Sequence, residues 1–109
     1  MLHNDKFKSE GVTALTRTEQ TALAIRSLRN LFGMSQNELA KAAGVSRPTI
    51  SRLEKLEGEK SIRSTTLDNL MRVFAEHGAE VHFLADNVRI ELSKTALVFA
   101  ANNIRSQAK

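Results

Sequence analysis

The stretch SQNELAKAAGVSRPTISRLE, residues 35–54, decides the fold, because it predicts two short helices joined by a tight turn. Gly44 marks the turn, since a chain that bends sharply there needs a residue that tolerates a positive φ. Apolar residues lie on one face of each helix at helical spacing: Leu39, Ala40 and Ala43 before the turn, and Val45, Ile50 and Leu53 after it. The stretch therefore predicts a helix-turn-helix with its second helix on the outside of the domain.

The capping signals agree with these two helices. Ser35 is followed three residues later by Glu38, which is the pattern of a capping box and predicts that the first helix starts there. Ser46 is placed to cap the second helix. Pro48, the only proline of the chain, falls in the first turn of that helix, where a missing N–H costs nothing.

The stretch resembles the helix-turn-helix of the phage lambda repressor and Cro class, also called the xenobiotic-response-element family of bacterial regulators. The resemblance covers roughly residues 17–78. The matching residues are Gln36, Glu38, Leu39, Ala40, Gly44, Val45, Ser46, Ile50, Leu53 and Glu54. It implies a mainly α fold, a lambda-repressor-like helical domain that binds double-stranded DNA. The alternative is a pair of packed helices without a role in DNA binding, which the geometry alone permits.

The resemblance also assigns roles to residues. In this family the exposed early part of the second helix meets base edges, which implies base reading by Arg47, Pro48, Thr49, Ser51 and Arg52. A guanidinium group suits this role, because it can donate two parallel hydrogen bonds to guanine. Either arginine could instead bind phosphate or pair with Glu54 or Glu38. Glu54 matches a position that is structural in relatives.

Phosphate contacts are expected from residues around the motif: Gln36, Asn37, Lys41, Ser46, Lys60 and Arg63. Gln36 opens the first helix of the motif, and relatives use a glutamine there to hold phosphate together with the helix dipole. The loop that follows the motif is polar and looks longer than in the phage repressors, so the family's loop contacts transfer less directly to Lys60 and Arg63.

Outside the motif, the sequence predicts three further parts. Residues 1–16 show no periodicity and are expected to form a flexible N-terminal arm, which in relatives sometimes wraps around the duplex. Thr16 and Glu19 form another capping box at the start of the first helix of residues 17–78, the DNA-binding domain. Arg26 and Arg29 of this helix are expected in solvent. A last helix at about 65–77 closes the core, and Gly78 ends it.

Residues 79–109 are predicted to form an extension for dimerisation or partner binding. Strict alternation around residues 85–87 predicts a β-hairpin at about 81–92. The tail fits a helix, although residues 95–99 could equally be a strand. Its apolar stripe, Leu97, Ala100, Ala101 and Ile104, could contact a second copy or dock on the core. A chain that ends at Gly78 is expected to stay folded.

Composition limits the remaining possibilities. The chain has 109 residues and a formal net charge of +4, which favours an anionic partner without naming it. It has no cysteine, and His3, His77 and His82 have no ligand spacing, so neither a disulfide nor a metal site is expected. No cofactor or enzymatic activity is expected. No apolar run approaches a membrane span, and the first ten residues lack the apolar core of a signal peptide, so the cytoplasm and association with the nucleoid are expected.

These observations together predict a transcriptional regulator, most simply an autoregulating repressor that binds a palindromic operator as a homodimer. The alternative is a DNA-binding antitoxin that represses its own operon and holds a cognate toxin protein. A helical scaffold that does not bind DNA is a third interpretation.

Overall fold

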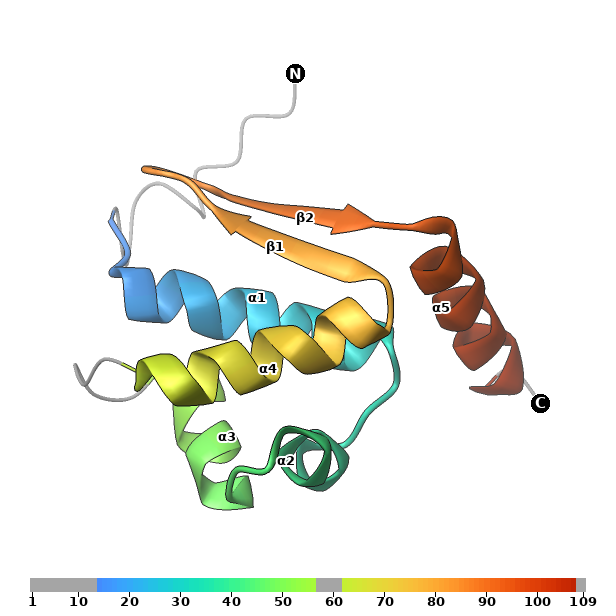
Figure 1. Cartoon of the computed structure of the whole chain (residues 1–109), viewed down its shortest axis with the longest axis horizontal. Coiled ribbons are helices and arrows are strands. Elements are labelled where there is room, and N and C mark those ends of the chain that lie inside the picture. Colours follow the sequence, from blue (N-terminus) through green and yellow to red (C-terminus); the bar gives the residue numbers. More distant parts are fainter. Residues whose placement is uncertain (1–13, 57–61, 108–109) are drawn as a thin grey trace, which may run out of the picture.

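The computed structural model describes residues 14–56 and 62–107, and the elements below are those of this part of the chain. They are five helices and one two-stranded sheet, and Figure 1 labels them along the chain. The helices are α1 (Arg17–Leu31), α2 (Gln36–Ala43), α3 (Arg47–Glu54), α4 (Ser64–Glu76) and α5 (Lys94–Gln107); the strands are β1 (Ala79–Phe83) and β2 (Val88–Leu92). The prediction of a mainly α fold with a C-terminal hairpin is confirmed.

The helix starts are fixed by side chains that the sequence had indicated. The hydroxyl of Thr16 accepts a hydrogen bond from the backbone N–H of Glu19, and the Glu19 carboxylate accepts one from the backbone N–H of Thr16. Ser35 and Glu38 make the same reciprocal pair at the start of α2. These capping boxes satisfy backbone donors that would otherwise lack a partner in the first helical turn.

Gly44 makes the turn of the motif as predicted. It has φ 70° and ψ 32°, in the left-handed region that a side chain makes costly, and its N–H closes the end of α2 by bonding to Ala40 and Lys41 carbonyls. The turn changes the direction of the chain between α2 and α3. The two helices contact each other and lie together on one side of the molecule (Figure 1).

One apolar core joins the helices to the hairpin. Its largest fully buried side chains come from all four helices α1–α4: Ile25, Leu28, Leu39, Ile50, Leu70, Val73 and Phe74. These side chains are mainly aliphatic and belong to one cluster. The chain can therefore form a core although it has few aromatic residues. Within the core, Phe32 packs on Phe74 with ring centroids 6.4 Å apart.

The hairpin lies against α1 and α4, opposite α2 and α3 (Figure 1). Its strands are antiparallel, with Ala79 opposite Leu92 and Phe83 opposite Val88. Val81, Ile90 and Leu92 pack against the core, whereas the alternate positions face outward. At the hairpin tip, the guanidinium of Arg17 lies 5.2 Å from the centre of the Phe83 ring and donates to the carbonyl of Leu84.

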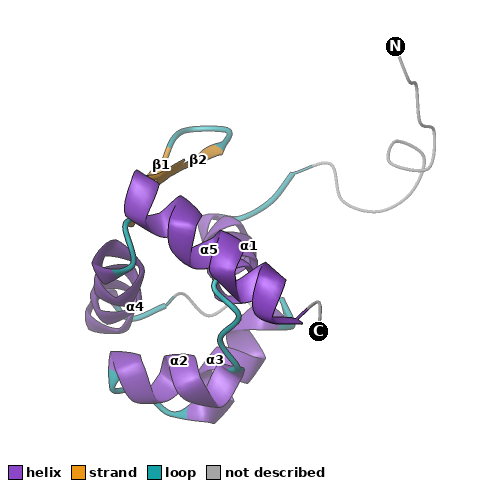
Figure 2. Ribbon diagram, turned by 90° about the vertical axis from the view of Figure 1, so that its right-hand side faces the viewer, coloured by secondary structure: helices purple, strands orange, loops and turns teal. Residues whose placement is uncertain are grey.

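The tail is a helix, which decides between the two structures that its sequence allowed. In Figure 2, α5 crosses in front of α1 after leaving β2. Ala96 and Ala100 are buried, 0% and 5% exposed, whereas Leu97 and Ile104 are 54% and 58% exposed. The predicted apolar stripe is therefore only partly buried: Ala100 docks on the core beside Ala96, whereas Leu97 and Ile104 stay exposed.

The close approach of α5 explains why small residues face inward. A Cβ placed on Gly78 would come within 3.3 Å of the Ala96 Cβ and would collide with the Ser93 hydroxyl. Ala79 and Ala96 belong to the core, at 1% and 0% exposure, so helices α1–α4 do not hold it alone. A chain ending at Gly78 would lack these two core residues, and the expectation that it stays folded stays a prediction.

No helix within residues 14–56 and 62–107 is long and apolar enough to cross a membrane. The predicted N-terminal arm falls almost entirely outside the described residues.

Candidate nucleic-acid interface

Helix α3 has a buried face and an exposed face. Ile50 is fully buried, Glu54 is 6% exposed, and Leu53 packs against the core from a half-buried position. Ser46 caps the helix, with its hydroxyl accepting from the backbone N–H of Thr49, and Pro48 lies in the first turn. The eight residues of α3 are thus anchored along one side only, and the other side is available to a partner.

The predicted base-reading residues all lie on α3. Arg47, Pro48 and Arg52 are exposed, and Thr49 and Ser51 are half-buried. Since a helix rises about 1.5 Å per residue, Arg47 and Arg52 span about 7.5 Å along the axis, a distance suited to neighbouring base pairs. Among the described residues, neither arginine forms a salt bridge with Glu38 or Glu54.

The hydroxyl groups of Ser46 and Thr49 are 2.7 Å apart and share a hydrogen bond. Ser46 also accepts from the Thr49 backbone N–H, so it serves the helix cap first. A hydroxyl has one donor and two acceptor positions, so each of these groups keeps unused capacity for a phosphate or a base edge. The pair therefore fixes the side-chain direction of Thr49 on the first turn of α3.

A buried salt bridge holds the inner side of α3. Arg29 of α1 donates from Nε and Nη2 to the two carboxylate oxygens of Glu54, each at 2.7 Å. The side chains are 13% and 4% exposed. Arg29 Nη1 also donates to the carbonyl of Met34, at 2.8 Å, which ties the same guanidinium to the connection between α1 and α2. The hydrogen bond with Glu54 raises the pKa of Arg29, so its charge is permanent.

The position of Arg29 corrects the expectation that it is solvated. Residues 25, 28, 29 and 32 follow the spacing i, i+3, i+4 and i+7, so Arg29 lies on the same buried side of α1 as Ile25, Leu28 and Phe32. That spacing was the signal in the sequence, together with an acidic residue, Glu54, on the inward side of α3. Two opposite charges at inward positions of contacting helices predict a pair.

Gln36 has a partner that the sequence did not indicate. Its amide Nε2 donates to Glu54 Oε1 at 3.3 Å, and the residue is half-buried at the first position of α2. One of its two amide hydrogens remains for another acceptor. Glu54 therefore connects α1, α2 and α3 through Arg29 and Gln36, and it holds the Gln36 side chain beside the positive end of the α2 dipole.

The other predicted phosphate-binding residues differ in their placement. Asn37 and Lys41 are exposed and four residues apart, so they lie on one face of α2. Ser46 is exposed at the start of α3, which α2 contacts. Arg63 is exposed but precedes α4, outside the helix-turn-helix itself. Lys60 lies outside the described residues. Four of the predicted phosphate-binding residues therefore lie on α2 or at the start of α3, the helix that carries the predicted base-reading residues: Gln36, Asn37, Lys41 and Ser46.

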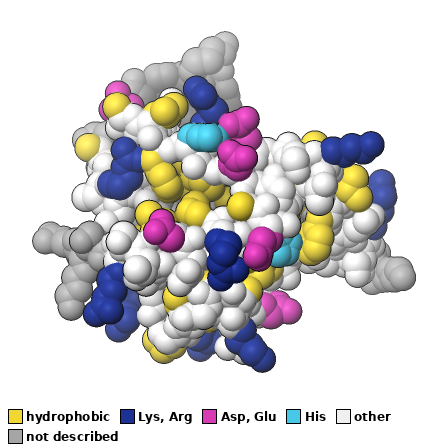
Figure 3. All heavy atoms as spheres, viewed as in Figure 1, with side chains coloured by type: hydrophobic (Ala, Val, Ile, Leu, Met, Phe, Trp, Pro, Cys, Tyr) yellow, Lys and Arg dark blue, Asp and Glu magenta, His cyan; other side chains and the backbone are white. Residues whose placement is uncertain are grey.

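The charge on this side of the molecule suits an anion. In Figure 3, Lys and Arg side chains follow the lower edge, where α2 and α3 lie in Figure 1. Glu38 is the acidic residue in the first turn of α2, and its hydrogen bonds from Ser35 lower the pKa of its carboxyl. That carboxylate serves the capping box. An exposed helix whose two arginines form no salt bridge with any described residue, held from behind by a buried ion pair, defines a DNA-binding domain of the helix-turn-helix class.

Comparison with known protein families also identifies a helix-turn-helix domain, and it names the family. The chain belongs to the helix-turn-helix family of Cro/C1 type, whose model matches residues 25–81, and the protein is a DNA-binding transcription regulator. This class is typically non-enzymatic. The match begins inside α1 and ends inside β1, so it includes every residue of α2, α3 and α4.

Among solved structures, the chain is similar to the clp gene regulator ClgR from Corynebacterium glutamicum. The two chains are 26% identical, the TM-score is 0.50, and the similarity covers 86% of this chain and 82% of that one. A comparison with curated proteins found no significant match.

Proposed function

We propose that this regulator is an autoregulating repressor that binds a palindromic operator as a homodimer. The observation that carries the proposal is the division of α3 into a rigidly anchored inner face and an exposed outer face with two arginines. Regulators that occlude a promoter need no effector site, and residues 79–107 are committed to the hairpin and α5. The similarity to a solved gene regulator is consistent with this role.

In the proposed complex, α3 lies in the major groove and Arg47 and Arg52 contact base edges. Pro48, Thr49 and Ser51 complete the surface that faces the bases, through apolar contact and hydroxyl groups. Gln36, Asn37, Lys41 and Ser46 hold phosphates on either side, with Lys60 and Arg63 as contacts from the loop after α3. Phosphate contacts set the position of the domain on the duplex, and base contacts set the sequence.

Dimerisation follows from the size of the module and from α5. One helix-turn-helix covers few base pairs and buries too little surface for tight specific binding. The outward face of α5 carries Leu97, Val98 and Ile104, which are 54%, 50% and 58% exposed. Leu97 and Ile104 lie three residues before and four residues after the buried Ala100, at the exposed margin of the docked face, and Val98 lies on the far side of the helix. A second copy that covers this face would remove apolar surface from water without disturbing α3.

The same exposed face of α5 is the observation that favours a second candidate, a DNA-binding antitoxin. In that case a toxin would cover Leu97, Val98 and Ile104, and the repressor activity on its own operon would remain. A co-transcribed neighbouring gene whose product co-purifies with this protein would identify the antitoxin. A homodimer that sediments as two copies, with no such gene, would identify the simple repressor.

The test of the proposed function is selection of binding sites from random duplex DNA with the full chain. The selected motif should be palindromic, with half-site centres about 34 Å apart, or one helical turn. If the dimer neutralises roughly eight phosphates, log K should fall with log salt concentration at a slope of about −7. A salt slope near zero and the absence of any enriched motif would contradict the proposal.

A further inference from the structure

A group of three side chains on the hairpin has no part in the DNA interface. Glu80 and His82 are two residues apart on β1, so both face outward, and Glu91 lies directly opposite Glu80 on β2. The ligand atoms of the three side chains all lie within 4.8 Å of one another. Figure 3 shows a histidine bordered by acidic side chains over the hairpin.

The two carboxylates of this group repel each other, because Glu80 and Glu91 lie directly opposite on neighbouring strands. Glu80 and Glu91 form a cross-strand pair of like charges, which destabilises a hairpin unless a cation lies between them. The register places Arg89 opposite His82 on the same outer face. Within the described ranges, however, no ion pair joins Arg89 to either carboxylate, and the only group found beside both is the His82 ring.

The distances from His82 suit two ligands of one metal ion. Its Nε2 atom lies 2.6 Å from Glu91 Oε1 and 3.7 Å from Glu80 Oε2. Two ligands bound to a tetrahedral Zn²⁺ at about 2.0 Å are about 3.3 Å apart, a value between these two distances. A rotation about the glutamate side-chain torsions is enough to make both distances equal, since Glu80 and Glu91 are 71% and 63% exposed.

The reactive nitrogen of His82 points into this group. Although the side chain as a whole is 41% exposed, Nε2 itself is buried and has no hydrogen bond among the described residues. Its contact with Glu91 Oε1 is short but lacks hydrogen-bond geometry, so the carboxylate lies beside this nitrogen without accepting a hydrogen bond from it. An imidazole nitrogen together with two carboxylates is a mixed nitrogen and oxygen donor set, which suits transition-metal ions such as Zn²⁺.

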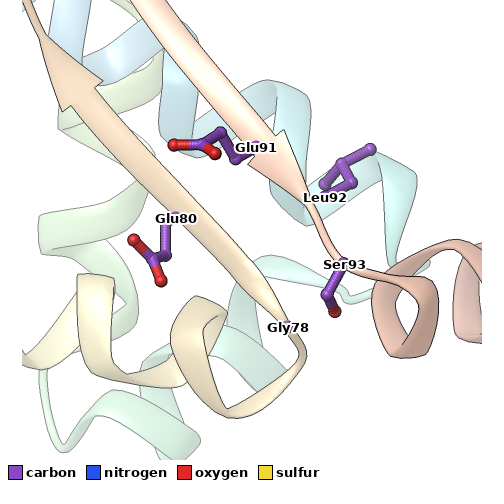
Figure 4. A pocket seen from close by; sticks show the side chains of 5 residues that line it. All are labelled: Gly78, Glu80, Glu91, Leu92 and Ser93. Carbon is purple, nitrogen blue, oxygen red and sulfur yellow. The ribbon is translucent and has the colours of Figure 1, made fainter.

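We infer that Glu80, His82 and Glu91 form a binding site for a divalent transition-metal ion of the Zn²⁺ class. One imidazole and two carboxylates supply three ligands, which leaves one position open. Both glutamates line a shallow pocket together with Gly78, Leu92 and Ser93, and Figure 4 shows their carboxylates beside the two strands. A water molecule or a small oxygen ligand can take the open position.

The consequence of metal binding is a link between β1 and β2. The ion replaces repulsion between Glu80 and Glu91 with a shared ligand, at the end of the hairpin from which α5 leaves. The site is on the outward face of the hairpin, and α3 lies on the opposite side of α1 and α4 (Figure 1). Metal binding is therefore expected to stabilise the fold without altering the base-reading residues.

The test is a titration of the full-length, untagged protein with Zn²⁺, followed by calorimetry, and with Co²⁺, followed by visible absorption. The wild type should bind one ion per chain, and Zn²⁺ should raise its unfolding temperature. His82→Gln and Glu80→Gln should each weaken binding by at least about tenfold, since loss of even an outer-shell partner has that effect. Glu76→Gln, an exposed glutamate on α4, is the matched control and should bind like the wild type.

Two results would overturn the inference. The first is no binding of either ion by the wild type. That result would mean that Arg89 and solvent compensate the repulsion between the two carboxylates without a metal ion. The second is binding that survives both His82→Gln and Glu80→Gln, which would place the metal elsewhere in the chain. Circular dichroism spectra and operator affinity equal to those of the wild type would show that these exposed substitutions leave the fold intact.

Discussion

Replacing Glu54 with alanine should lower the free energy of unfolding by about 3 kcal/mol. The substitution leaves the Arg29 guanidinium in a site where its side chain is 13% exposed, without the two 2.7 Å hydrogen bonds that it donates to the carboxylate. Breaking a buried ion pair on one side costs about 3–5 kcal/mol. The lower end applies because Arg29 keeps its bond to the Met34 carbonyl and some contact with water. The loss is a large fraction of the stability of an ordinary domain.

The assay is urea denaturation followed by far-ultraviolet circular dichroism, because the chain has no Trp or Tyr for intrinsic fluorescence. The matched control is Glu76→Ala. Glu76 accepts from Arg72 at 3.3 Å, but both side chains are at least half exposed, so this change should cost under about 0.5 kcal/mol. The double variant Arg29→Met, Glu54→Leu should recover most of the stability, since apolar groups can replace a buried pair. Equal costs for Glu54→Ala and Glu76→Ala would refute the reasoning.

Three further predictions concern the DNA contact, the cap of α2 and the dimer. Gln36→Ala should weaken binding to all duplexes by about 1–2 kcal/mol, because a phosphate contact carries no sequence information; an effect confined to the selected site, in filter-binding or fluorescence titrations, would contradict it. Because the pKa of Glu38 is lowered in the folded state, its contribution is present above the ordinary carboxyl pKa and is lost as pH falls through the lowered value. Glu38→Gln should therefore flatten the acid side of a plot of unfolding midpoint against pH, and an unchanged slope would argue against the cap. The pair Leu97→Glu, Ile104→Glu should convert the dimer to a monomer in sedimentation and lower operator affinity, whereas a persisting dimer would place the interface elsewhere.

The sequence predicted the structure best where neighbouring residues alone decide the backbone conformation. Gly44 and the Ser35 capping box are such cases, because each is decided within a few residues of chain. The same holds for the exposed face of α3, whose residues are fixed once the helix and its inner side chains are known. The assignment of roles to those residues came from the family resemblance, and it stays a prediction.

The rest depended on contacts between elements that are distant in the chain. Arg29 was expected in solvent because it is charged, although its spacing from Ile25 placed it inward; only the approach of Glu54 makes that position favourable. On α5, the sequence predicted one apolar stripe, Leu97, Ala100, Ala101 and Ile104, and left open whether it meets the core or a second copy. Packing buries Ala96, which passes close to Gly78, together with Ala100, and it leaves Leu97 and Ile104 exposed.

The hairpin site illustrates a different limit. The three histidines lack ligand spacing with one another, and the sequence did not indicate this group because the neighbours of His82 are glutamates, one of them on the other strand. Cross-strand register decides which side chains meet, and a slip of one residue would have turned Glu91 to the opposite face.

The central claim, that the exposed face of α3 reads base pairs, is tested most directly by selecting binding sites from random DNA with the wild type and with Arg52→Ala. The variant should lose preference at one base pair in each half-site and bind the wild-type operator about 1–3 kcal/mol more weakly. Arg72→Ala, an exposed arginine on α4, is the control and should return the wild-type motif. If Arg52→Ala also returns the wild-type motif unchanged, Arg52 does not read a base, and the proposed role of this face of α3 is contradicted.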